Sequence, residues 1–167
     1  MKKLIALCLA LTFTTPAFAL LIGKVDVQNV LLSIEEGKRV REKLKKKFDE
    51  KQGIIKKEED KIKKAQEDFQ KQSLVMNDKA KQTKQMEIQK SIMKLQQETA
   101  GYQKEIQDME NEMKKPILDK LKVIIEEVSA KAGVDVTFES NTAPIIYAKS
   151  EKDLTEDVVK AYNKKHK

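Results

Sequence analysis

The chain has 167 residues, of which 37% are charged: 34 Lys and Arg residues stand against 27 Asp and Glu residues, a formal net charge of +7. Only 5% of the residues are aromatic, and there are five Gly, three Pro, one Cys and no Trp. This composition argues against a compact enzyme with a deep apolar pocket and favours long helices. The positive net charge favours three classes of binding partner: nucleic acid, membrane surfaces and acidic proteins.

The first residues have the pattern of a secretory signal peptide. Lys2 and Lys3 precede an apolar run over residues 4–13, and Ala17-Phe18-Ala19 is a small-residue cleavage pattern. The run is shorter than the ~20 residues that a membrane-spanning helix needs. We therefore expect residues 1–19 to be cleaved after Ala19. The remaining chain would carry 32 basic and 27 acidic residues and no cysteine, and as an exported protein it would not be expected to bind nucleic acid.

Residues 38–115, called the arm below, contain no proline and show two coiled-coil periodicities. The first has a seven-residue repeat of Phe48, Ile55, Ile62, Phe69 and Met76, and the second alternates steps of four and three over Ile88, Ile92, Leu95, Thr99, Tyr102, Ile106, Met109 and Met113. Residues 73–78 interrupt the pattern, and Asn77-Asp78 can cap a new helix. The sequence predicts an antiparallel α-helical hairpin with its tip near 73–78, in which the numbers of facing residues add to about 154.

This register places two glycines, Gly53 and Gly101, opposite each other. Each weakens its helix by about 1 kcal/mol relative to Ala. We expect them to form a flexible joint in the arm; the alternative is that they are simply tolerated in exposed helices.

The two chain ends, residues 20–37 and 116–167, are expected to form a small body. Alternating apolar and polar residues predict strands at 23–28 and 134–138, and the apolar run that follows Pro144 predicts a third short strand at 145–148. Ser33 to Glu36 has the form of a capping box, Gly133 is expected to end a helix that follows Pro116, and Thr155 is expected to cap a last helix. The fold class is therefore α+β.

A body of about 70 residues without disulfides is marginal alone and would expose sheet edges. We expect it to be assembled between subunits. The candidate residues for this oligomerisation are Val25, Val27, Val134, Val136, Phe138, Ile145 and Tyr147.

Charge is unevenly divided between the two parts. The arm holds 22 basic and 15 acidic residues, whereas the body holds 10 and 12. Methionine suits surfaces that accept varied apolar partners. Met109 and Met113 belong to the second periodic register and so lie on the predicted seam, the line along which the two arm helices pack together, whereas Met86 and Met93 lie off it. The candidate binding residues of arm and tip are Leu74, Val75, Met76, Met86, Met93, Lys79, Lys81 and Lys84.

The sequence contains none of the catalytic or nucleotide-binding motifs that we considered typical of enzymes. His166 is the single histidine, and no nucleotide-binding or nucleophile-elbow motif occurs. We expect a binding protein without enzymatic activity, cofactor or metal.

Three segments, in their order around the hairpin, carry a family resemblance. They are Gly23-Lys24-Val25-Asp26-Val27-Gln28-Asn29-Val30-Leu31, the turn Glu36-Gly37-Lys38 into the Lys/Gln-rich hairpin, and the C-terminal Tyr147-Ala148 followed by Asp153-Leu154-Thr155-Glu156-Asp157-Val158-Val159. Together with the signal peptide, they resemble the Skp/OmpH family of periplasmic chaperones for outer-membrane proteins. The resemblance implies a homotrimer whose helical tentacles enclose a cavity and hold unfolded outer-membrane β-barrel proteins without ATP. It also implies a periplasmic location.

The sequence is also compatible with two other functions. The basic arms could bind an anionic membrane surface or lipopolysaccharide. A lipopolysaccharide-binding site has been proposed in the family, but none of its residues is assigned to a position of this sequence. A structural coiled-coil spacer is the other alternative, although the sparse heptads and the glycines disfavour a stiff rod.

Overall fold

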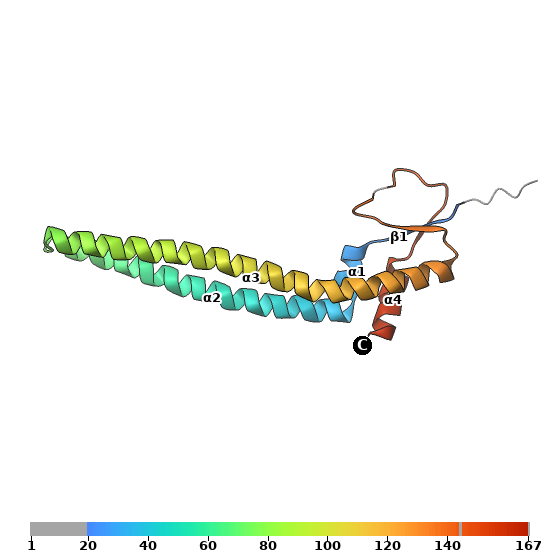
Figure 1. Ribbon diagram of the computed structural model, residues 1–167, viewed down its shortest axis with the longest axis horizontal. Helices are drawn as coiled ribbons and strands as arrows, with labels where there is room; N and C mark the ends of the chain where they lie inside the picture. The colour runs from blue at the N-terminus through green and yellow to red at the C-terminus, as the bar shows by residue number, and fades with distance from the viewer. Residues whose placement is uncertain (1–19, 144, 167) are drawn as a thin grey trace, which may run out of the picture.

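The structure is a computed structural model that describes residues 20–143 and 145–166, so the predicted signal peptide lies outside the described residues. Its elements are, in chain order, β1 (Ile22–Val25), α1 (Val27–Ser33), α2 (Glu35–Gln72), α3 (Asp78–Ala132), β2 (Val136–Glu139), β3 (Glu151–Asp153) and α4 (Thr155–Lys165). Two long helices extend from a small body that contains both ends of the described chain (Figure 1). The predicted α+β class with a long helical hairpin is confirmed.

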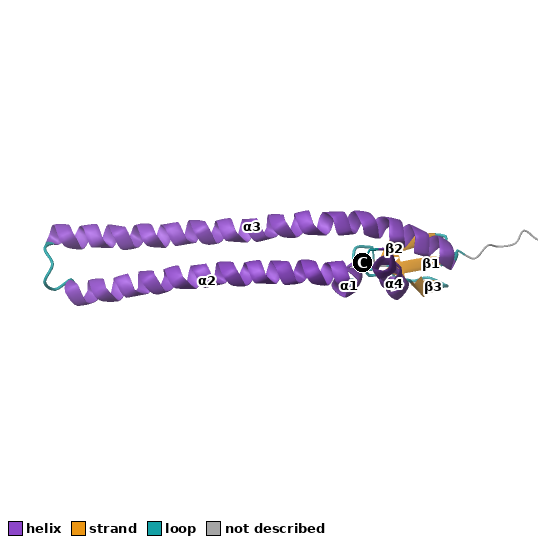
Figure 2. Ribbon diagram, turned by 90° about the horizontal axis from the view of Figure 1, so that it is seen from below, coloured by secondary structure: helices purple, strands orange, loops and turns teal. Residues whose placement is uncertain are grey.

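The hairpin has the predicted register. Lys51 of α2 forms an ion pair with Glu105 of α3, and Phe48 and Ile106 line one groove between the helices. Asn77 caps α3, since its side chain accepts a hydrogen bond from the backbone N–H of Ala80 at 2.9 Å. The helices run side by side from the body to the turn at the tip (Figure 2).

The base of the hairpin differs from the prediction. The proposed capping box is wrong: α2 begins at Glu35, and the Ser33 hydroxyl instead donates to the side chain of Asn29. The N–H of Glu35 donates to the side chain of Asn163 in α4, 128 residues away. A local pattern could not reveal this cap, because its acceptor comes from the far end of the chain.

Helix α3 does not stop at the predicted boundary between arm and body. It passes through Pro116 and ends at Ala132, where Gly133 adopts the left-handed conformation with φ 68° as expected for a terminating glycine. One continuous helix therefore belongs to both parts.

The sheet is parallel, with the strand order β2-β1-β3. The prediction of a strand at 145–148 is wrong, because the third strand is the polar segment β3, whose Glu151 lies 2.7 Å from the Nζ of Lys24. The first strand is also shorter than predicted: Asp26 caps α1 by accepting from the N–H of Asn29, so Val27 lies in that helix.

The start of the last helix also differs from the prediction. Thr155 is the first residue of α4 rather than its cap, and its hydroxyl accepts a hydrogen bond from the N–H of Asp26.

The apolar core lies entirely in the body. A stripe on α3 with helical spacing packs against α1, β1 and α4, and the buried hydrophobic residues are Val25, Val30, Leu31, Ile34, Ile117, Leu121, Ile124, Val128, Leu154, Val158 and Tyr162. By contrast, every residue from 38 to 115 is at least partly exposed. The arm is therefore held by a narrow seam, and the body alone contains a closed core.

Candidate functional site

The seam of the arm contains a lysine at a heptad position where an apolar residue is usual. The Nζ of Lys51 lies 2.7 Å from Glu105 Oε2 and 4.2 Å from the centroid of the Tyr102 ring. The hydrogen bond to Glu105 raises the pKa of Lys51, and the same bond lowers the pKa of Glu105. The two helices are thus joined by a charged contact as well as by half-buried apolar residues.

The tip presents apolar side chains to solvent. Leu74 is 91% exposed and Val75 is 87% exposed, whereas Met76 is half-buried. Both exposed residues lie in the turn between α2 and α3, where Asn77 and Asp78 start the returning helix. Both side chains are therefore accessible to a ligand in the structure as it stands.

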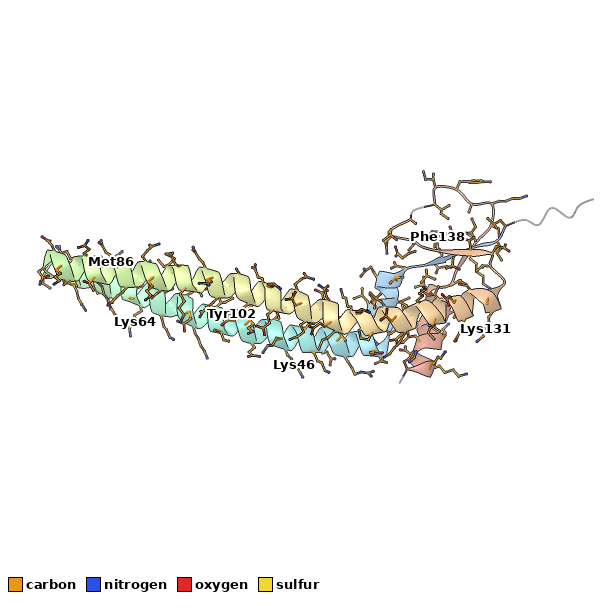
Figure 3. All side chains as sticks on the ribbon, viewed as in Figure 1. Lys46, Lys64, Met86, Tyr102, Lys131 and Phe138 are labelled. Carbon is orange, nitrogen blue, oxygen red and sulfur yellow. The ribbon has the colours of Figure 1, made fainter. Side chains whose placement is uncertain are left out.

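A shallow groove of about 700 Å³ lies between the helices near the tip. It combines apolar residues with glutamines, and its lining is Gln66, Phe69, Gln70, Gln85, Met86, Ile88, Gln89 and Ile92. Met86 is labelled in Figure 3 and is 59% exposed. Met93 is 60% exposed but lies outside the groove, and Met109 and Met113 are half-buried on the seam.

The three candidate lysines near the tip differ in their surroundings. Lys79 is exposed, while Lys81 and Lys84 are half-buried. Lys84 forms an ion pair of 3.1 Å with Glu87, which partly neutralises it. Lys79 and Lys81 take part in no ion pair within the described chain, so their charge remains available to a ligand.

Positive charge is concentrated in the distal part of the arm, residues 61–94. This part has nine Lys and four acidic residues, against 22 basic and 15 acidic residues in the arm as a whole. Its excess of five positive charges thus accounts for most of the arm's excess of seven. The groove and the apolar tip lie in this same region.

The glycine pair lies in open surroundings. A Cβ added at Gly53 or Gly101 would have no heavy atom within 4 Å outside its own helix turn. Both positions are exposed and lie next to the Lys51–Glu105 contact. Whether the arm bends there stays a prediction.

The seven candidate assembly residues of the body separate into two groups. Val25 is 1% exposed in the core of its own chain, and Val27 and Val134 pack against that core. Val136, Ile145 and Tyr147 are exposed, by 51%, 38% and 82%, and Phe138 is half-buried. The sequence reasoning missed Ile146, which is fully exposed between two residues that it named.

The described residues contain neither a metal-ligand cluster nor a membrane-spanning helix. Among the described residues, no cluster of three or more His, Cys, Asp or Glu side chains is arranged to hold a metal ion. None of the helices in the described part of the chain combines the length and apolar character that crossing a bilayer requires.

Comparison with known proteins confirms the resemblance. Residues 21–162 match the family described as "Outer membrane protein (OmpH-like)". The fold is similar to that of a crystal structure from Caulobacter crescentus CB15, described as a "putative outer membrane chaperone (OmpH-like)", with 17% sequence identity and a TM-score of 0.70 over 90% of this chain and 88% of that chain. No curated protein matches the sequence. Because the family match covers nearly the whole chain, this protein belongs to the OmpH-like outer membrane protein family.

Proposed function

We propose that this protein is a periplasmic holdase chaperone, which binds unfolded outer-membrane β-barrel proteins and prevents their aggregation without ATP. The observation that carries the proposal is the arm itself. A long hairpin without buried core residues presents the apolar tip residues Leu74 and Val75 within its most basic region. Membership in the OmpH-like family, and the description of the similar crystal structure as a chaperone, support the same role.

The binding mechanism follows from charge and weak apolar contact. The positive distal arm attracts a negatively charged unfolded chain over a distance of about one Debye length, ~10 Å at 0.1 M salt. Exposed side chains such as Leu74, Val75 and Met86 then contact apolar residues of the client. Many weak contacts together hold the client by avidity, and each can break separately, so release needs no nucleotide.

Assembly supplies the cavity in which the client is held. The family resemblance implies a homotrimer, in which three arms would surround one client. The single chain supports an assembly, since edge strand β2 exposes Val136 and the loop after it exposes Ile146 and Tyr147. Covering these residues between subunits removes apolar surface from water and protects the sheet edge.

The test is an aggregation assay. A urea-unfolded outer-membrane β-barrel protein is diluted into buffer with and without the purified protein, and light scattering is followed. We expect suppression of scattering to saturate at about one oligomer per client, without added ATP. Scattering equal to that of a buffer control at a severalfold excess of the protein would refute the proposal.

The distal lysines also favour a second candidate, binding to an anionic lipid surface or lipopolysaccharide. Lys63, Lys64 and Lys71 have no ion-pair partner within the described chain, and neither do Lys79 and Lys81. Each lysine near an anionic surface contributes about 1 kcal/mol of attraction. Co-sedimentation with protein-free anionic vesicles, compared with neutral vesicles, tests this function separately from client binding.

A further inference from the structure

The groove near the tip has two walls of glutamine. Gln66 and Gln70 are one helical turn apart on α2, and Gln85 and Gln89 are one turn apart on α3. All four are exposed, and none of their side-chain amides takes part in a hydrogen bond within the described chain. Each side-chain amide can both donate and accept hydrogen bonds. Each wall therefore presents two amides, one helical turn apart, that are free to bond to a ligand.

The floor of this groove is apolar. Phe69 of α2 and Ile88 and Ile92 of α3 are half-buried there, and Met86 lies beside them with a flexible side chain. No charged residue belongs to the lining. A ligand that fits therefore has apolar groups on one face and neutral hydrogen-bonding groups along its two edges.

The spacing of the glutamines identifies that ligand. Four residues of a helix rise about 6 Å. Two residues of an extended strand span about 6.6 to 6.8 Å, and along one edge of the strand the backbone N–H and C=O groups recur at that interval. Two glutamines of one wall therefore match successive backbone groups on one edge of an extended peptide, while its alternate side chains face the floor.

Other occupants fit the groove less well. An acyl chain would cover the glutamine amides without replacing their hydrogen bonds to water, which is costly. A helical ligand has satisfied its own backbone groups and would leave the amides unused. The surrounding distal arm is positive, with nine Lys against four acidic residues over 61–94, which favours an acidic chain.

We propose that this groove is a binding site for an extended, acidic polypeptide segment, with the two glutamine walls bonding to its backbone edges and the apolar floor taking alternate side chains. The proposal rests on the proposed function and names the part of the client that is recognised. Recognition through the backbone makes the site tolerant of sequence, as a strand-binding surface is. A segment that later forms a β-strand presents this alternation of apolar side chains.

The test compares two fourfold variants of the purified protein. The groove variant carries Gln66→Ala, Gln70→Ala, Gln85→Ala and Gln89→Ala. The control variant carries Gln72→Ala, Gln82→Ala, Gln96→Ala and Gln97→Ala, four exposed arm positions outside the groove. Alanine preserves the helices at both sets of positions, and the net charge is unchanged.

The probe is a fluorescein-labelled peptide of about twelve residues that alternates Val with Thr and Asp, and its Kd is measured by anisotropy. A second peptide has the same side chains, but every other backbone nitrogen is methylated, which removes the donors along one edge. We expect the groove variant to raise the Kd of the first peptide about fivefold or more and the control variant to leave it within twofold. Methylation should weaken binding to the wild-type protein and have little effect on the groove variant.

The outcomes separate this site from the general function. If the groove variant binds the peptide as the control does, the site is wrong, even when both variants still suppress client aggregation. Equal binding of methylated and unmethylated peptides by the wild-type protein would also overturn it. A change in oligomeric mass of the groove variant by light scattering would assign the groove to a contact between subunits instead. Failure of the wild-type protein to suppress aggregation would refute the holdase function, while the peptide titration would still decide the site.

Discussion

Tyr162 of α4 donates a hydrogen bond of 2.6 Å from its hydroxyl to Glu36 of α2, although the two residues are 126 positions apart. Lys120 of α3 donates to both oxygens of the same carboxylate, at 2.8 and 3.0 Å. Asn163, the neighbour of Tyr162, accepts from the first N–H of α2. The last helix of the chain therefore fixes the base of the arm, and the two arm helices meet there at one shared carboxylate.

The first prediction concerns this anchor. The ring of Tyr162 is fully buried, so Tyr162→Phe keeps its packing and removes only the hydrogen bond to Glu36. We expect the free energy of unfolding to fall by about 1.5 to 3 kcal/mol, as for a hydrogen bond to a charged group. Urea denaturation measures the change. Tyr102→Phe is the control, because the hydroxyl of this partly exposed arm residue makes no hydrogen bond within the described chain; equal stability of both variants would contradict the anchor.

The second prediction is a loss of stability in acid. Burial raises the pKa of Glu36, but the hydrogen bonds from Lys120 and Tyr162 outweigh it and hold the pKa below its ordinary value of 4.5. The ionised group therefore stabilises the fold fully above pH 4.5, and this contribution is lost as the pH falls through the lowered native pKa.

Urea denaturation of wild type and Glu36→Gln, from neutral pH to about pH 3, measures this effect. Glu36→Gln is expected to be less stable at neutral pH and to lose less stability in acid. Parallel curves for the two proteins across that range would show that the Glu36 carboxylate is not responsible.

The third prediction compares glycines in the same helix. A Cβ at position 37 would clash with the carbonyl oxygen of Leu31, whereas one at position 53 would meet open space. Gly37→Ala should therefore cost about 3 kcal/mol or more, because backbone must move. Gly53→Ala should raise stability by up to about 1 kcal/mol through helix propensity. Thermal denaturation distinguishes the two.

The Gly53→Ala/Gly101→Ala variant also tests the expected joint. If the arm bends at this level, small-angle scattering should show a narrower distribution of arm spread than in the wild type. An unchanged distribution would mean that the glycines are simply tolerated.

The arm could be predicted from sequence because its determinants are local and periodic. The heptads set the register that brings Lys51 to Glu105, and Asn77 starts the second helix by a contact only three residues long. Gly133 ends α3 for an equally local reason. Periodicity over many turns remains recognisable even though several positions of the first register are polar, as at Lys51.

The body was harder to predict because its determinants are distant in sequence. Strand β3 is polar and pairs in parallel with β1, and an ion pair between Glu151 and Lys24 adds a side-chain contact between the two strands. The apolar segment 145–147 looks more like a strand but lies in an exposed loop. The Asn163 cap and the Glu36–Tyr162 bond likewise join opposite ends of the chain. At the candidate site, the exposed tip was predictable from the break in the heptads, but the glutamine walls emerge only when the two helices are placed side by side.

The fourth prediction is that client binding depends on salt and on the distal lysines. Raising salt from ~50 to ~500 mM shortens the Debye length to a few ångströms and should weaken binding of an acidic unfolded client severalfold. Lys79→Gln, Lys81→Gln and Lys84→Gln together should weaken binding at low salt more than Lys43→Gln, Lys46→Gln and Lys56→Gln, which remove the same charge from the proximal arm. Affinity that is equal at both salt concentrations would exclude electrostatic attraction.

The fifth prediction assigns the two exposed apolar clusters to different tasks. Ile146→Asp with Tyr147→Asp places charge on the body surface that we expect subunits to cover, so the oligomer should dissociate because a charge cannot be buried there without a partner. Leu74→Asp with Val75→Asp changes an equally exposed pair at the tip. This second variant should keep the wild-type mass in analytical ultracentrifugation but suppress aggregation of an unfolded client less well. Since both variants add two negative charges at exposed sites, a loss of assembly in both, or in neither, would contradict the division of roles between body and arm.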